Sequence, residues 1–462
     1  MIIRTVMVPH PPCGIPEIGI SELKDMQATE EGYQKMADFI AEAKPDTIIV
    51  TSPHAVMYRD YFNISSGSHA RGDFSSFHAG SISFDVDYDE ELTSALTQYC
   101  VDKQFPAGTE YDRDKELDHG TMVPLYFINQ KYRNYKLVRI GLSGYPLTMH
   151  YRLGMYLDEI IEKLDRKAVI VASGDLAHCQ KEDGPYGYQP EGPEYDKRIM
   201  ETMGSGNFEE LLEYDPDFLE QCMECGHRSF CIMAGALDGR AVTPHVLSHE
   251  APFGVGYGIV TYDVGDKDER RHFLKQYEEK EQQKIEDRTK QEDAYVKLAR
   301  MSLTSWIRGH KKIDLPDDLP EEMIGKRAGT FVSIHEHGEL RGCIGTISAV
   351  RKNIAEEIIE NAISASTRDP RFDPIDEEEL PYLELSVDVL GETEPIQDKS
   401  QLDVKKYGVI CSTSDGRRGL LLPNLDGVNT VDQQISIAAR KGDIDPEDDE
   451  MKLERFEVVR HV

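Results

Sequence analysis

Short apolar runs rich in valine and isoleucine alternate with amphipathic stretches through the first half of the chain. The runs predict β-strands at residues 2–8, 47–51, 135–140, 168–172 and 257–262. Apolar residues at helical spacing predict helices at 33–43, 121–129, 151–164 and 228–237. Strands separated by helices are typical of βαβ units. The first half is therefore predicted to be an α/β domain with a mostly parallel sheet.

The second half has a different pattern. Residues 330–334 and 340–347 predict a β-hairpin around a turn at 336–339. Further strands are expected at 383–390, 407–413, 419–422 and 455–460, and helices at 353–365 and 430–440. This order indicates a smaller α+β domain.

A charged segment lies between the two halves. More than half of residues 265–292 are charged, and acidic and basic side chains interleave. Such a pattern is typical of a solvent-exposed helix with i,i+4 ion pairs. Apolar spacing returns at Val296, Ala299, Leu303 and Trp306, which predicts a core-facing helix. We therefore expect domains at 1–264 and 285–462, joined by a charged helical linker at 265–284.

The net charge and the cysteines indicate which binding partners and which cellular compartment to expect. The 52 Lys and Arg residues against 85 Asp and Glu give a formal net charge of −33, which repels nucleic acid and anionic membranes. The N-terminus lacks the features of a signal peptide, and no apolar run approaches the roughly 20 residues of a membrane span. Eight scattered cysteines do not form a disulfide framework, so a reducing cytoplasm is expected.

The CxxC at Cys222 and Cys225 has no second pair to complete a zinc site. The oligomeric state stays open, and a homo-oligomer is compatible with the sequence.

Three histidines follow predicted strands. His10 follows strand 2–8, His54 follows strand 47–51, and His178 comes six residues after strand 168–172. In an open α/β sheet, ligands bind beyond the carboxyl ends of the strands. Each histidine alone would be interpreted as a hydrogen-bonded surface residue, but together they predict a metal site. Imidazole suits Fe, Zn, Cu and Ni, and a carboxylate third ligand with open positions would favour Fe(II).

The third ligand and a further histidine complete the candidate site. Glu250 is the best-placed carboxylate, but spacing alone leaves His249 and Glu224 open. His119 stands at a predicted helix N-terminus that Asp118 can cap. A helix N-terminus favours neutral imidazole, so His119 is expected to hydrogen-bond a bound ligand.

Several strings around these residues resemble one family. VPHPP, SPH, LDHGTMVPL and SGDLAH, in this order, resemble the LigB-like class III extradiol dioxygenases, a superfamily that includes the Memo proteins. CGHRSFCIMAGAL and HEAPFGVGYGIVTY resemble the end of the Memo branch. The resemblance covers residues 1–264. It implies Fe(II) as the metal and a small aromatic diol as substrate, while Zn is the alternative that the same ligand types allow.

The same resemblance implies a role for each candidate residue. Carried over by motif, the metal ligands are His10, His54 and Glu250, the acid/base is His178, and His119 contacts the substrate. In the Memo branch the third ligand position looks like a cysteine, so a glutamate at this position is closer to the dioxygenase pattern.

The second half carries its own motifs. LRGCIG, TRDPRF and LPN resemble the AMMECR-type domain over residues 285–462. The fusion resembles the AmmeMemoRadiSam family, which implies a radical-SAM partner protein. This chain has no CxxxCxxC motif of its own. The motifs mark Cys343, Arg341, Arg368 and Asp369 as a candidate site. Cys343 is either a thiolate with a pKa lowered by Arg341 or an inert packed thiol.

Three functions fit these observations. The first is an Fe(II)-dependent dioxygenase-like enzyme that acts on a catechol-type small molecule. The second is a non-catalytic metal-binding or adaptor protein that serves a radical-SAM partner, because a fold does not guarantee an activity. The third is Zn-dependent hydrolysis by the same ligands.

Overall fold

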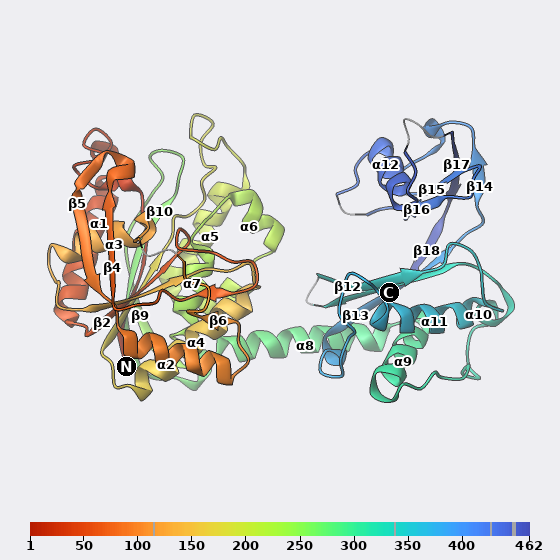
Figure 1. Cartoon of the computed structure of the whole chain (residues 1–462), viewed down its shortest axis with the longest axis horizontal. Coiled ribbons are helices and arrows are strands. Elements are labelled where there is room, and N and C mark those ends of the chain that lie inside the picture. Colours follow the sequence, from red (N-terminus) through yellow and green to blue (C-terminus); the bar gives the residue numbers. More distant parts are fainter. Residues whose placement is uncertain (114–115, 337–338, 426, 446–449) are drawn as a thin grey trace. The chain divides into compact units, whose positions relative to one another are not determined.

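The chain folds into two compact units, Met1–Glu278 and Glu279–Val462 (Figure 1). The computed structural model describes residues 1–113, 116–336, 339–425, 427–445 and 450–462. The predicted turn at 336–339 includes His337 and Gly338, which lie outside the described residues. The division into an α/β unit and a unit of antiparallel sheets with helices confirms the predicted fold class.

A six-stranded mixed sheet forms the centre of the N-terminal unit. Its strands are β1 (Ile2–Val8), β2 (Thr47–Ser52), β7 (Lys136–Gly141), β8 (Ala168–Ser173), β9 (Arg240–Glu250) and β10 (Tyr257–Lys267), in the order β7-β2-β8-β1-β10-β9. The first four strands of that order run parallel, and β10 and β9 are antiparallel. The apolar pattern did not predict β9. This strand contains Pro244 and many exposed residues, which an edge strand tolerates because one side of it needs no ladder hydrogen bonds.

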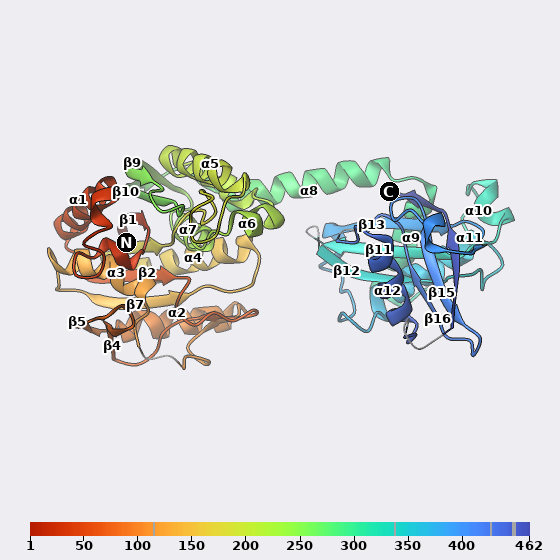
Figure 2. The ribbon, with the colours of Figure 1, turned by 90° about the horizontal axis from the view of Figure 1, so that it is seen from above.

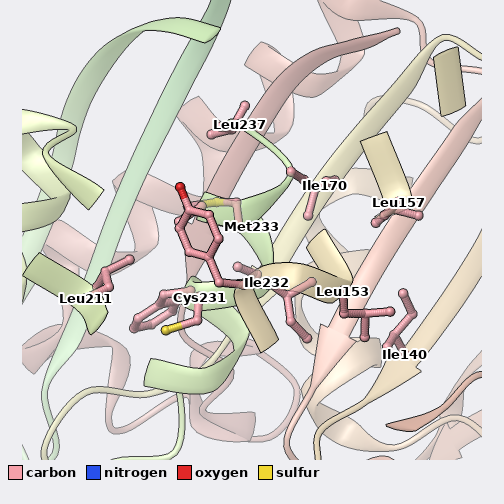
Figure 3. Close-up of a cluster of buried hydrophobic side chains, with 14 of the residues drawn as sticks. Ile140, Leu153, Leu157, Ile170, Leu211, Cys231, Ile232, Met233 and Leu237 are labelled. Carbon is pink, nitrogen blue, oxygen red and sulfur yellow. The ribbon is translucent and has the colours of Figure 1, made fainter. Parts of the chain in front are cut away.

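Helices cover both faces of this sheet, because alternate side chains of each strand point to opposite faces. One core contains Val6, Val8 and Val50 and is closed by α1 (Gln27–Ala43) and α3 (His119–Asn129). The other core contains Ile140 and Ile170, which Figure 3 shows beside side chains of the covering helices. It is closed by α2 (Glu90–Asp102), α4 (Leu147–Lys163), α5 (Glu191–Ser205) and α7 (His227–Gly235).

Glycines let two of these helices touch along their backbones. A Cβ on Gly154 of α4 would lie 2.0 Å from the carbonyl oxygen of Ile232, and one on Gly235 of α7 would lie 1.8 Å from that of Tyr151. Any larger residue would push α4 and α7 apart and open the core shown in Figure 3.

A hairpin and short pieces complete the unit. The hairpin of β4 (His69–Phe74) and β5 (Ala79–Asp87), joined by the 3-10 turn η3 (Ser75–Phe77), lies beside β7 (Figure 2). The strands β3 (Phe62–Asn63) and β6 (Ala107–Gly108) pair with each other. Two short helical pieces are η4 (Phe208–Leu212) and α6 (Pro216–Cys222).

The charged segment is only partly helical. Residues 265–267 continue strand β10, and the helix α8 runs from Phe273 to Gln291, past the expected end of the linker at residue 284. The division between the units falls inside this helix. Its i,i+3 pairs, Lys284 with Glu281 and Lys290 with Asp287, agree with the interleaved charges of the sequence.

Two antiparallel sheets build the C-terminal unit. The first has the order β12-β11-β13-β18, with β11 (Thr330–Glu336), β12 (Glu339–Gly345), β13 (Leu383–Leu390) and β18 (Val458–His461). It packs on α9 (Ala294–Gly309) and α11 (Ile354–Thr367). The second has the order β14-β17-β15-β16, with β14 (Glu394–Ile396), β15 (Gly408–Thr413), β16 (Arg418–Leu421) and β17 (Met451–Phe456), and it packs on α12 (Val431–Lys441).

One predicted element of this unit is wrong. The single final strand expected at 455–460 is two strands, because the chain leaves the second sheet after Phe456 and enters the first at Val458. The apolar pattern gave no sign of this change of sheet. Within the described parts of the chain, no helix is both long and apolar enough to cross a membrane.

Candidate metal centre

His10 and His54 meet at the carboxyl edge of the parallel strands. His10 follows β1 after Pro9, and His54 lies in the turn that follows β2. Both strands pair in parallel with β8, so their carboxyl ends share one edge of the sheet. The Nε2 atoms of the two rings are 3.0 Å apart. If two imidazole nitrogens bind one metal ion at about 2.1 Å each, with an angle of about 90° at the metal, the two nitrogens are about 3 Å apart. The distance between the two Nε2 atoms matches this value.

The hydrogen bond at Nδ1 of His10 directs its Nε2 lone pair towards a ligand. The Ser173 hydroxyl donates to the carbonyl oxygen of Gly120 at 2.5 Å, so it accepts from Nδ1 of His10 at 2.9 Å. The proton of a neutral His10 ring is therefore on Nδ1. A partner that fixes the tautomer in this way is typical of metal-binding histidines. The structure thus pre-orients His10 towards His54.

His119 adds a third imidazole from the start of α3. One ring nitrogen from each of His10, His54 and His119 lies within 4.8 Å of the others. Asp118 caps the helix, as predicted, by accepting from the backbone N–H of Thr121 at 3.0 Å. The arrangement places His119 at the same edge of the sheet as the two histidines that follow strands.

A buried arginine holds this cap in place. The Arg139 guanidinium is fully buried and lies 3.4 Å from the Asp118 carboxylate. It also donates to the Ser65 hydroxyl at 2.7 Å. Asp118 in turn accepts from the hydroxyl of Ser52 at 2.5 Å. Ser52 is the last residue of β2, and its hydroxyl accepts from the backbone N–H of His54 at 3.2 Å. The cap therefore fixes the backbone around two of the three imidazoles.

A second donor group shares His10. It consists of His10, Asp175 and Cys225, whose donor atoms also lie within 4.8 Å of one another. The Cys225 sulfur is 3.7 Å from Nε2 of His10, and Asp175 accepts from the backbone N–H of His10 at 2.8 Å. A Cβ on Gly174 would lie 2.0 Å from the Cα of Gly226. Only glycines allow the loop after β8 to approach the Cys225 loop this closely.

The carboxylate predicted as third ligand is engaged elsewhere. Oε1 of Glu250 accepts from the backbone N–H and the hydroxyl of Thr29 at 2.6 and 2.7 Å. Neither donor group formed by the described residues contains Glu250 or the two alternatives, His249 and Glu224. The structure therefore brings His10 and His54 together but leaves Glu250 outside their cluster.

His178 lies at the same edge of the sheet. Its backbone N–H donates to the carbonyl oxygen of Cys222 at 3.2 Å. Nε2 of His178 is buried and has no hydrogen-bond partner among the described residues. The ring of Tyr186 lies against it at a centroid distance of 5.2 Å. A buried nitrogen without a partner can form a hydrogen bond with a substrate hydroxyl.

Burial keeps these imidazoles neutral. It lowers the pKa of His10 well below its ordinary value, and the neighbouring His54 lowers this pKa further. Burial also lowers the pKa of His54 and of His178, and it lowers the pKa of His119 to about 4. Neutral imidazole is the form that binds a metal or accepts a proton.

Burial shifts the pKa of the Cys225 thiol upwards, in contrast to the pKa values of the histidines. Burial raises the pKa of Cys225 well above its ordinary value, and the Asp175 carboxylate raises it further. Cys225 is therefore a thiol until a cation arrives, since a coordinated metal deprotonates a thiol outright. Together, neutral imidazoles and a thiol fit a divalent transition metal.

The C-terminal candidates form a separate cluster around Cys343. Its backbone N–H donates to the Asp369 carboxylate at 2.9 Å, and its sulfur accepts from the Ser333 hydroxyl at 3.2 Å. Arg371 donates to the same carboxylate at 2.7 Å and to the Cys343 carbonyl oxygen at 3.2 Å. The hydrogen bonds from Arg371 lower the pKa of Asp369 to about 2, so the carboxylate is ionised. Arg371 and Ser333 were not predicted as part of this site.

The other two C-terminal candidates have different surroundings. Arg341 was expected beside the Cys343 thiol, but its guanidinium pairs with Glu379 at 2.6 Å and donates to the carbonyl oxygen of Asp373 at 2.8 Å. Arg368 is exposed just after α11. Cys343 and Asp369 are therefore the two candidates that the structure joins by a hydrogen bond.

Comparison with known proteins identifies both units. Residues 4–260 match the family model described as the catalytic LigB subunit of aromatic ring-opening dioxygenase. The chain belongs to the LigB family. Residues 296–461 of this LigB-family chain match the AMMECR1 model. These matches confirm the fusion that the motifs indicated.

Individual relatives resemble the whole chain or a part of it. A protein of Clostridium acetobutylicum is 41% identical over 463 residues, which covers 98% of each chain. A protein of Thermotoga maritima is 46% identical over 171 residues, or 37% of this chain and 98% of that protein. An uncharacterized protein from Pyrococcus horikoshii, known as a crystal structure, is 27% identical and covers 36% of this LigB-family chain and 88% of its own, with a TM-score of 0.34.

Two residues near the metal centre were not predicted as site residues. Asp175 stands in the SGDLAH string two residues after β8, the same spacing as His10 after β1, whereas Cys225 stands in CGHRSFC between α6 and α7 and follows no strand. For Cys225, the resemblance of CGHRSFC to the Memo branch, with its cysteine at the third ligand position, is the signal that could have found it.

Proposed function

We propose that the LigB unit is a metal-dependent oxidoreductase that opens the ring of a catechol-type small molecule. Its metal is Fe(II), with His10 and His54 as ligands. The observation that carries the proposal is the pair of Nε2 atoms 3.0 Å apart, beside the buried Nε2 of His178 that has no partner among the described residues. The family description, an aromatic ring-opening dioxygenase, supports this class of reaction.

Two residues, Cys225 and His119, are close enough to His10 to serve as the third metal ligand. The Cys225 sulfur and the His119 ring both lie in donor groups with His10, whereas Glu250 would have to leave its two hydrogen bonds to Thr29. When bound, Fe(II) with three protein ligands supplies open positions for a bidentate diol and for dioxygen. Among His10, His54 and His119, the exposed residue is His54. This exposure supports a substrate that reaches the metal past His54.

The residues of the chain handle the proton and the orientation of the substrate. Nε2 of His178 takes the proton of a diol hydroxyl, because burial lowers the pKa of this ring and leaves it neutral. His119, held by the Asp118 cap, is placed to hydrogen-bond the bound diol. The Asp175 carboxylate stands close enough to His178 to favour the protonated form that results from the transfer.

One experiment tests this proposal against its alternatives. The protein is purified without oxygen, its metal content is measured, and Fe(II) is added before a panel of catechols while dioxygen uptake is followed. Uptake that depends on Fe(II) and on a catechol supports the proposal. A protein that binds no iron after reconstitution would contradict it, and the Zn(II)-loaded protein serves as the redox-inert control.

A second candidate function rests on Cys225. A thiol 3.7 Å from Nε2 of His10 is a soft donor that suits Zn as well as Fe. It favours a metal-binding or adaptor protein, or a Zn-dependent hydrolase, over an oxidising enzyme. Iron that binds in the same experiment without any dioxygen uptake would favour this candidate.

We also propose a radical-SAM partner protein. Both units are matched by family models in one chain, and the fusion resembles the AmmeMemoRadiSam family. Anaerobic co-purification with the tagged full chain, followed by iron and sulfide analysis of any companion protein, tests this part of the proposal. A companion without an iron–sulfur cluster, or no companion at all, would contradict it.

A further inference from the structure

An exposed tyrosine stands over the proposed base. The ring of Tyr186 is 55% exposed, and its plane is tilted by 32° to the ring of His178 at a centroid distance of 5.2 Å. Among the described residues, no hydrogen-bond partner of its hydroxyl is found. Tyr186 therefore offers both a ring face and its hydroxyl beside His178.

The backbone below this tyrosine is fixed. Gln180 and Tyr188 form an antiparallel bridge, and the N–H of Gly184 donates to the carbonyl oxygen of Lys181 at 3.0 Å. Lys181 also donates from its Nζ to the carbonyl oxygen of Pro252 at 2.7 Å. The loop is thus closed at its base, and its tip carries Tyr186 to a defined position over His178.

A second aromatic ring lies beside another histidine of the site. Phe77, in the η3 turn of the β4–β5 hairpin, lies 5.5 Å from the ring of His119 at an angle of 66°. His119 and His178 therefore each have an aromatic neighbour that comes from a separate loop. Aromatic pairs favour centroid distances of about 4.5–7 Å, either offset or edge to face. Each ring is therefore already in contact with its histidine, and a further ring would pack on a face that this contact leaves open.

We propose that Tyr186 determines the substrate specificity of the site by packing its ring against a planar aromatic substrate. This inference rests on the proposed function. A diol that hydrogen-bonds through one hydroxyl to Nε2 of His178, at about 2.8 Å, is brought into reach of the Tyr186 ring. Tyr186 is a binding residue, and the proton transfer is left to His178.

Binding of a coloured diol tests the inference without turnover. The probe is 4-nitrocatechol, titrated anaerobically into the Zn(II)- and Fe(II)-loaded full chain and followed by its visible spectrum. Tyr186→Ala should weaken binding by about 3- to 10-fold, the change expected for the loss of an aromatic pair. Tyr186→Phe keeps the ring and should stay within about 2-fold of the wild type by the same scale.

Tyr188→Ala is the matched control. Tyr188 belongs to the same loop and is 50% exposed, but no ring contact to a site histidine is found for it among the described residues. Its removal should leave binding unchanged. If Tyr186→Ala binds the diol as tightly as Tyr188→Ala, the inference is overturned while the proposed function stands. If the wild type binds no diol with either metal, the proposed function fails and the specificity role fails with it.

Deuterium exchange at the C2 position of each histidine separates these outcomes from misfolding. Tyr186→Ala should speed exchange at His178, which loses its cover, and leave exchange at the exposed His245 unchanged. An unchanged rate at His178 would show that Tyr186 does not cover this ring in solution and would overturn the inference.

Discussion

The Ser173 hydroxyl accepts a hydrogen bond from Nδ1 of His10 at 2.9 Å, because its own proton goes to the carbonyl oxygen of Gly120. This bond decides which nitrogen of His10 carries the lone pair that can bind a metal. It also links the end of β8 to the residues that follow β1, so the sheet itself orients the ring.

Ser173→Ala should therefore weaken metal binding. The His10 ring loses the partner that holds its proton on Nδ1, and such changes typically cost about 10- to 100-fold in affinity. Competition titrations with a chromogenic chelator measure the effect for Fe(II) and Zn(II). Ser248→Ala is the control, since Ser248 is also buried but contacts none of the site histidines in the described structure. Equal affinities of the two variants would contradict the role of Ser173.

His178→Ala and His10→Ala should separate the base from the ligands. His178→Ala is expected to keep its iron and to lose dioxygen uptake, by the roughly 10²- to 10⁴-fold that a general base contributes. His10→Ala should lose the iron itself. Metal analysis and dioxygen uptake on the same samples provide both readouts. Loss of iron from His178→Ala would mean that this histidine is a ligand.

The identity of the third ligand can be determined from three variants. Cys225→Ser and His119→Gln each remove a donor near His10, whereas Glu250→Gln leaves the donor groups intact. We expect the first or the second to weaken metal affinity at least about 10-fold, on the scale of a disturbed ligand, and Glu250→Gln to bind as the wild type does. A large loss in Glu250→Gln would restore Glu250 as the ligand.

Acid should destabilise the N-terminal unit through His150. This fully buried ring accepts from the N–H of Ser143 and donates to the carbonyl oxygen of Pro146, and burial lowers its pKa to about 3. The unfolded chain binds a proton below about pH 6.5 and the folded chain does not, so stability falls as the pH drops from there towards 3. The slope is about 1.4 kcal/mol per pH unit for one group.

Hydrogen exchange of amides in α4, corrected for the intrinsic exchange rate, measures this slope between pH 7 and pH 5. His150→Gln should reduce the slope by up to about 1.4 kcal/mol per pH unit, whatever its effect on stability at pH 7, because one titrating group is gone while the other buried histidines still titrate. A slope that stays the same in His150→Gln would assign the acid sensitivity to other groups.

Asp369→Asn should destabilise the AMMECR1 unit. Asp369 is buried, accepts from the N–H of Cys343 and pairs with Arg371. Removing its charge weakens both contacts, and we expect the free energy of unfolding to fall by about 1–3 kcal/mol. Trp306 is the single tryptophan of the chain and packs against the core of this unit, so its fluorescence during urea unfolding reports this unit.

The exposed ion pair of Asp415 and Arg417 provides the control for this measurement. Asp415→Asn removes the same charge from a surface position, so the urea midpoint should stay at its wild-type value. Equal midpoints for Asp369→Asn and Asp415→Asn would show that the buried carboxylate does not stabilise the unit.

The apolar pattern located the buried strands well and the contacts between loops poorly. The strand Ile2–Val8 was predicted with its observed bounds, and β2, β7 and β8 within one residue at each end, because both faces of these strands are buried and their apolar runs are continuous. The strand β9 was missed, since this edge strand carries Pro244 and polar residues. The split between β17 and β18 was missed because apolar alternation does not say which sheet a strand joins.

The sequence by itself determined that His10 and His54 would meet. Each follows a buried parallel strand, and the carboxyl ends of such strands share an edge. Only the tertiary structure decided what joins them there. Cys225 lies near His10 because Gly174 and Gly226 allow two loops to contact each other. Glu250 lies outside this cluster because its carboxylate is hydrogen-bonded to Thr29. Such contacts depend on the packing of loops distant in the sequence, and no local period of apolar residues encodes them.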